Sequence, residues 1–152
     1  MKTKLIAISL LLLLPLLLTS CLGQIEDTNG ENTALCTLTD EQIFAEHPSI
    51  ATVGSVASRV NDKQTFRVNK LSGVYAFDSF LVQNEDLSLT VSTTLYEGNL
   101  RIVLLCDGVY VQDVPIGEGQ TVSIANANGR YQVRLAGESA KLDATVTLDA
   151  AE

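Results

Sequence analysis

Few side chains in this sequence can act as nucleophiles or bind metal ions: three cysteines, Cys21, Cys36 and Cys106, and one histidine, His47. His47 stands beside Pro48 at the end of a short predicted helix, where an imidazole suits the negative end of the helix dipole. The sequence has no Gly-x-Ser-x-Gly elbow, no Gly-x-x-x-x-Gly-Lys-Ser/Thr loop and no Cys-x-x-Cys pair. We therefore expect a protein that is not an enzyme, with no catalytic residue, metal site or cofactor.

Carboxylates are the other groups with possible chemistry, because a pair can hydrolyse glycosides and a cluster can bind calcium. Their spacing selects no pair, and charges on solvated loops are the better interpretation. Calcium is somewhat more plausible than a hydrolytic pair, because hard cations bind clustered oxygens, and Asn84-Glu85-Asp86 and Asp107 could contribute ligands. No Asp-x-Asp-x-Asp-Gly loop is present, however, so a calcium site is not expected. The carboxylates considered are Asp78, Glu85, Asp86, Asp107, Asp113 and Glu118.

Sugar binding by a β-sheet surface favours an exposed aromatic ring, and this sequence has no tryptophan. Tyr75, Tyr96 and Tyr110 are the candidates for ligand-facing aromatics. Tyr96 falls on the polar side of its predicted strand, whereas Tyr131 is in phase with Val133 and is expected in the core.

The N-terminus begins with Lys2 and Lys4, continues with an apolar stretch over 5–18 and ends with Leu18-Thr19-Ser20-Cys21. A charged start, an apolar stretch and small residues at the end are typical of a secretory signal peptide. Leu-Thr-Ser-Cys resembles a bacterial lipobox, so the chain resembles a bacterial lipoprotein precursor. The resemblance implies a lipid on the Cys21 sulfur, cleavage just before Cys21, and a domain anchored outside the cytoplasm on the bacterial cell membrane or outer membrane.

The whole chain has a net charge of −8, and without Lys2 and Lys4 the charge is near −10. This acidity argues against nucleic acid as a partner and against docking on anionic lipid through a basic patch. The remaining partners are the membrane, through the lipid at Cys21, and an envelope protein or a glycan.

The composition divides the chain into three segments: a signal peptide at 1–20, a lipidated cysteine and polar tether at 21–35, and one domain at 36–152. Cys36 and Cys106 form an even pair in an exported chain, which predicts a disulfide between them. Within the domain, Thr39-Asp40-Glu41-Gln42 predicts a capping box and a short helix near 40–47 that covers an end or edge.

From about residue 52 onward, apolar and polar residues alternate with a period of two, as in strands with one buried face. The apolar positions of these strands are Phe66, Val68, Leu87, Leu89, Val91, Leu95, Val122, Ile124, Tyr131, Val133, Leu135, Leu142, Ala144, Val146 and Leu148. The segment 100–106 is apolar apart from Arg101, which predicts a central strand covered on both faces.

Glycine-containing pairs separate these strands. Asp107-Gly108 predicts a tight turn between 100–106 and 109–114, forming a central hairpin. Glu97-Gly98-Asn99, Asn128-Gly129 and Gly137-Glu138 predict further turns, and 115–120 predicts a loop.

Short strands with regular turn signals predict an all-β fold, an antiparallel β-sandwich of jelly-roll or Ig-like type with one short N-terminal helix. The segment 129–135 resembles the last hairpin of small β-sandwich modules attached to secreted bacterial proteins. Together with the lipobox, this predicts a lipid-anchored, non-enzymatic interaction or structural module of the bacterial envelope. The alternative is a lipoprotein that binds carbohydrate or a small ligand.

Overall fold

The computed structural model describes residues 36–149, so the predicted signal peptide, Cys21 and the tether lie outside the described residues. One helix, α1 (Asp40–Phe44), precedes five strands. These are β1 (Ile50–Val60), β2 (Lys63–Ala76), β3 (Phe80–Cys106), β4 (Val109–Val114) and β5 (Gln120–Asp149), and they form one sheet in the order β1-β2-β5-β3-β4. Within residues 36–149 no helix is long and apolar enough to cross a bilayer.

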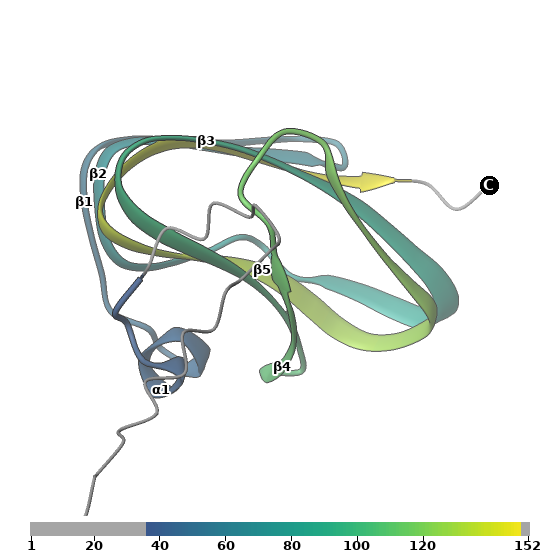
Figure 1. Ribbon diagram of the computed structural model, residues 1–152. Helices are drawn as coiled ribbons and strands as arrows, with labels where there is room; N and C mark the ends of the chain where they lie inside the picture. The colour runs from purple at the N-terminus through teal and green to yellow at the C-terminus, as the bar shows by residue number, and fades with distance from the viewer. Residues whose placement is uncertain (1–35, 150–152) are drawn as a thin grey trace, which may run out of the picture.

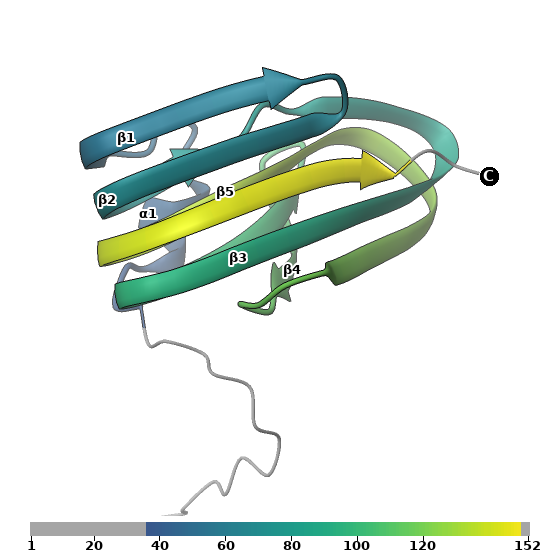
Figure 2. The same ribbon diagram turned by 90° about the horizontal axis from the view of Figure 1, so that it is seen from above.

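The sheet folds over into two layers, which confirms the predicted all-β antiparallel sandwich (Figure 1). β3 and β5 contain 27 and 30 residues and run through both layers. Residues 80–91 of β3 pair with 120–131 of β5, and residues 88–106 pair with 131–149. In both ladders the residue numbers increase along β3 while those of their partners in β5 decrease, so both pairings are antiparallel. The upper layer holds β1, the start of β2, both ends of β5 and the middle of β3. The lower layer holds β4, the end of β2, the end of β3 and the middle of β5 (Figures 1 and 2).

The main core lies between the two layers, and the predicted phase of the strands is confirmed. Every apolar position of the predicted alternation is buried there or packs against it, from Phe66 on β2 to Leu148 on β5. At about 25 cal/mol per Å² of apolar surface removed from water, this core is the main source of stability.

Three predicted turns are wrong, because they are bends within continuous strands. Gly98 has φ +80° where β3 passes from one layer to the other, and a Cβ there would lie 2.5 Å from the carbonyl oxygen of Ser139. Asn128-Gly129 and Gly137-Glu138 likewise lie inside β5. In a hairpin the two segments that flank the turn pair with each other. In this sheet the segments on either side of Gly98 both pair with β5, and those on either side of Gly129 and of Gly137 both pair with β3.

The capping box at the start of α1 is confirmed. The Gln42 backbone N–H donates to Thr39 Oγ1 at 3.4 Å, and the Thr39 N–H donates to Gln42 Oε1 at 2.9 Å. The helix covers the outer face of the lower layer, where Ile43 is fully buried against Val103 and Leu105. Since Ile102 and Leu104 face the main core, segment 100–106 is covered on both faces as predicted.

The turn Asp107-Gly108 is confirmed, with φ of +49° and +79° and Cys106 paired with Val109. The expectation of a central hairpin is only half right. β4 is the outermost strand of the sheet, and only Val114 among its residues is buried.

Arg134 corrects the expectation that its strand has one wet face. It is only 6% exposed, and its Nη1 donates to the carbonyl oxygens of Ile43 and Ala45, each at 2.7 Å. These carbonyls lie at the C-terminal end of α1, where a cation is favoured. At the other end of the helix, Arg101 Nη1 lies 2.5 Å from Asp40 Oδ1. Two arginines from the sheet therefore hold both ends of α1.

The predicted disulfide is wrong, since Cys36 and Cys106 are both free thiols. Cys106 packs against the core between the layers, and its Sγ lies 3.6 Å from the carbonyl oxygen of Asn128. Cys36 packs with α1 on the opposite face of the lower layer, 3.4 Å from the carbonyl oxygen of Ala136. Burial raises the pKa of the Cys36 thiol. The lower layer separates the two sulfur atoms, so no bridge can form in this fold.

Candidate functional site

The outer face of the upper layer is an open surface of polar side chains. Figure 2 looks onto this layer, with β1, β2, β5 and β3 side by side. Directly paired residues of neighbouring strands share a face. Arg67 pairs with Asp143, which pairs with Thr94, and all three alternate with core residues. We call Arg67, Tyr96, Lys141 and Asp143 the Tyr96 face.

Asp143 is the centre of the Tyr96 face. Its Oδ1 lies 2.8 Å from Arg67 Nε, and its Oδ2 accepts a hydrogen bond from the Tyr96 hydroxyl at 3.3 Å. The Arg67 side chain is 73% exposed, so most of its N–H donors are free to bind a ligand. The carboxylate thus orients both a planar donor group and an aromatic ring.

The Tyr96 ring is accessible, with the residue 56% exposed. Lys141 Nζ lies 5.9 Å from the ring centroid, a distance at which a cation interacts with an aromatic face. A half-exposed ring with a fixed hydroxyl offers an apolar surface next to polar groups.

Hydroxyl side chains continue this surface across the sheet. Ser58, Thr65, Thr145 and Ser92 are successive cross-strand neighbours, and Ser58 Oγ lies 2.6 Å from Thr65 Oγ1. A shallow hollow of about 390 Å³ lies between Val56 and this region. The surface therefore suits a flat, extended, hydroxyl-bearing ligand better than a compact molecule that needs an enclosing pocket.

The other two predicted tyrosines lie elsewhere. Tyr75 is half-buried and stacks on Phe66 with ring centroids 3.7 Å apart, and burial raises its pKa. It therefore belongs to the edge of the core. Tyr110 is 42% exposed on β4, but it packs against Phe44 of α1, 5.5 Å away, on the outer side of the lower layer. The structure therefore does not bring the three rings together.

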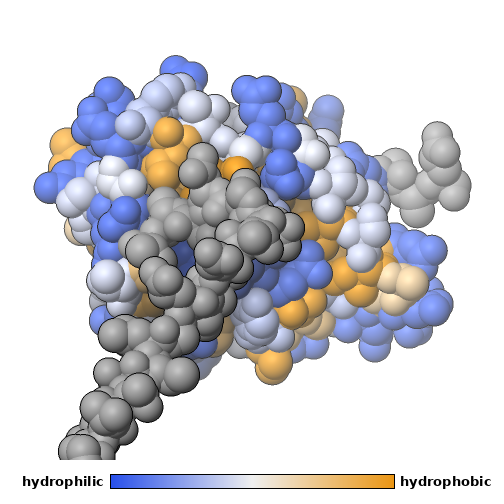
Figure 3. Space-filling view, viewed as in Figure 1, coloured by the Kyte–Doolittle hydropathy of each residue, from blue (hydrophilic) through white to orange (hydrophobic). Residues whose placement is uncertain are grey.

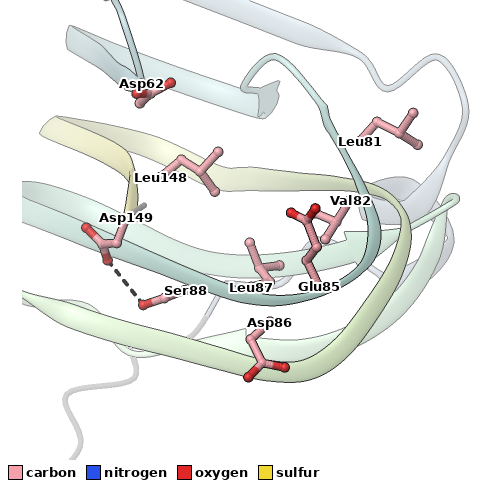
Figure 4. A pocket seen from close by; sticks show the side chains of 9 residues that line it. All are labelled: Asp62, Leu81, Val82, Glu85, Asp86, Leu87, Ser88, Leu148 and Asp149. Carbon is pink, nitrogen blue, oxygen red and sulfur yellow. Dashed lines mark hydrogen bonds between the residues drawn. The ribbon is translucent and has the colours of Figure 1, made fainter. Parts of the chain in front are cut away.

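The predicted carboxylates do not converge either. Glu85 and Asp86 line a hollow of about 250 Å³. In Figure 4 Glu85 points toward Val82, while Asp86 points to the other side of its strand. Asp86 Oδ1 instead accepts the Asn126 N–H at 2.9 Å. Asp107 is at the β3–β4 turn, where its carboxylate accepts the backbone N–H of Arg130 at 3.1 Å. In residues 36–149 no three His, Cys, Asp or Glu side chains gather closely enough to hold a metal ion.

The sequence missed the partners of Tyr96. Alternation assigned residues such as Asp143 to the wet face but gave no cross-strand neighbour for them. A signal did exist, because Arg67, Asp143 and Tyr96 all stand at polar positions beside core residues. The sequence pattern did not give the register of β2, β5 and β3, which makes these residues cross-strand neighbours.

Comparison with known proteins adds little to this description. No protein-family model matches the chain, and no curated protein matches it by sequence. Among solved structures, a carbohydrate-binding module CBM36 in complex with calcium and xylotriose is 17% identical, with a TM-score of 0.34 over 66% of this chain and 93% of that chain. A CBM36-1 domain of a multidomain xylanase from the hindgut metagenome of Trinervitermes trinervoides is also 17% identical, with a TM-score of 0.28 over 68% and 93%. The Drosophila melanogaster CENP-C cupin domain is 10% identical, with a TM-score of 0.28 over 65% and 80%.

Similarities this weak assign neither a ligand nor a site. The class that the structure itself defines is a small all-β sandwich with one open, polar sheet face.

Proposed function

We propose that the protein is a lipid-anchored, non-enzymatic module of the bacterial envelope, and that the Tyr96 face binds a glycan. The sequence Leu18-Thr19-Ser20-Cys21 after an apolar stretch supports the anchor. Two or more acyl chains hold a domain stably on a membrane, at about 0.8 kcal/mol per buried methylene. The module would then lie on the membrane surface that faces away from the cytoplasm.

The observation that carries the glycan proposal is the exposed Tyr96 ring beside the Arg67–Asp143 pair on an open sheet face. Sugars present apolar C–H surfaces that stack on aromatic rings, and hydroxyls that pair with guanidinium donors and carboxylate acceptors. The acidic net charge of −8 makes a neutral polymer a better ligand than a polyanion.

Binding is tested on the chain from Leu22 onward, which keeps every described residue, with an array of bacterial and plant polysaccharides. We expect retention on at least one neutral polysaccharide, lost in Tyr96→Ala and weakened in Arg67→Ala. Tyr110→Ala is the matched control, because it also removes a partly exposed tyrosine but lies on the lower layer. Absence of any glycan binding, or equal losses in Tyr96→Ala and Tyr110→Ala, would refute the proposed ligand.

The anchor is tested separately in a bacterial host by partitioning of the full chain between membrane and soluble fractions. Cys21→Ala should release the protein from membranes or leave it unprocessed. A variant that is processed and still partitions like the wild type would show that Cys21 carries no lipid.

A further inference from the structure

β1 is an outer strand of the sheet, and every one of its eleven residues is exposed. Among residues 36–149 it pairs only with β2, so alternate backbone N–H and C=O groups on its other side have no strand partner in this part of the chain. Its aliphatic side chains are open as well: Ile50 is 49% exposed, Val53 62%, Val56 66% and Val60 68%. In Figure 3 the apolar surface of one side of the molecule is divided into separate patches among hydrophilic residues.

Natural sheets protect such edges with short strands, charges, lysine or proline. The opposite edge of this sheet follows that rule. β4 has six residues, carries Asp113 held by Arg101 at 2.9 Å, and pairs with β3 through an irregular register. β1 is nearly twice as long and contains no proline and no lysine. Its single charge, Arg59, is paired with Asp78 at 3.2 Å.

We infer that β1 pairs antiparallel with β1 of a second copy of this chain, so that one sheet continues through both molecules. The strand is complementary to itself. The register centred on Ser55 runs along the strand except at Gly54, whose φ of +59° departs from extended backbone, and it places Ile50 opposite Val60, and Thr52 opposite Ser58. Arg59 then lies opposite the partner's Ala51, so no like charges face each other.

The charge distribution favours this surface for self-association. Two copies of a chain with net charge −8 repel each other overall. Between His47 and Phe77, however, the sequence holds only one acidic residue, Asp62. The β1–β2 hairpin is therefore a part of the molecule at which two copies can approach with few carboxylates facing each other.

The inference is tested by sedimentation velocity on the chain from Leu22 onward at micromolar concentrations. We expect a wild-type dimer, and a dissociation constant raised about tenfold or more by Val56→Lys. Val109→Lys is the matched control, because Val109 is 69% exposed on the other edge strand, and it should leave the dimer unchanged. Far-UV circular dichroism confirms that each variant is folded.

A second measurement tests the register directly. Residues directly opposite in an antiparallel pair have Cβ atoms about 4.5–5.5 Å apart, close enough for a disulfide after small adjustment. Oxidation of Ser55→Cys should give a cross-linked dimer on a non-reducing gel, and the wild type, with the same Cys36 and Cys106, should give none. A monomeric wild type, equal effects of Val56→Lys and Val109→Lys, or no Ser55→Cys cross-link would each overturn the β1 pairing.

Discussion

Arg134 is the residue for which the structure gives the sharpest stability prediction. Replacing it with methionine keeps a long apolar stem but removes the guanidinium that binds the Ile43 and Ala45 carbonyls, each at 2.7 Å. The third bond, from Nε to Gln132 Oε1 at 3.0 Å, is lost as well. The Ile43 and Ala45 carbonyls at the C-terminal end of α1 would then lose their hydrogen bonds to Arg134.

The size of the effect follows from two opposing contributions. A hydrogen bond to a charged group contributes about 1.5–3 kcal/mol, so the two carbonyl bonds are the main loss. Removing a buried charge offsets part of that loss, because its desolvation opposes folding, and burial lowers the pKa of Arg134 for the same reason. We expect Arg134→Met to lower the free energy of unfolding by about 2–4 kcal/mol.

Urea unfolding of the chain from Leu22 onward measures this difference. Arg130→Met is the control, four residues earlier on β5, where the side chain of an exposed arginine bonds, among residues 36–149, only the Ser79 hydroxyl at 3.2 Å. Its effect should stay within about 0.5 kcal/mol. Hydrogen exchange should also show faster opening of α1 in Arg134→Met than in Arg130→Met. Equal unfolding free energies for the two variants would refute the role of Arg134 in holding the helix.

Three further predictions follow from buried groups. Leu104→Ala should lower the free energy of unfolding by about 2–5 kcal/mol, whereas Thr147→Gln on the outer face should change it by only about 0.5 kcal/mol. Equal effects of the two changes in urea melts would contradict the assignment of Leu104 to the core face and Thr147 to the outer face. Thr93→Val should raise the free energy of unfolding by about 1 kcal/mol, because the Thr93 hydroxyl is buried and has no hydrogen-bond partner among residues 36–149. A loss of stability on urea unfolding would mean that the hydroxyl is hydrogen-bonded. Alkylation of the unfolded, non-reduced chain should modify both Cys36 and Cys106, and an intact mass lacking these two additions would show a disulfide after all.

The sequence by itself determined which strand residues face the core, and where the capping box and one tight turn lie. A period of two assigned residues such as Phe66 and Leu148 to the core, because alternate side chains of a strand point to opposite faces. The capping box at Thr39 and the turn at Asp107-Gly108 were also predictable, since both depend on side chains and φ angles within a few residues.

Tertiary structure decided everything that depends on which segments become neighbours. Gly98 and Gly129 marked positions of unusual backbone conformation, but only long-range pairing with β3 or β5 makes them bends rather than hairpins. The same phase that put Cys106 in the main core placed it away from Cys36, because α1 packs on the other face of the lower layer. Arg134 stood at a polar position and was nevertheless buried, because that helix covers it. Alternation fixes the face on which a side chain lies, but whether that face meets water, a helix or another strand depends on contacts between residues far apart in the chain.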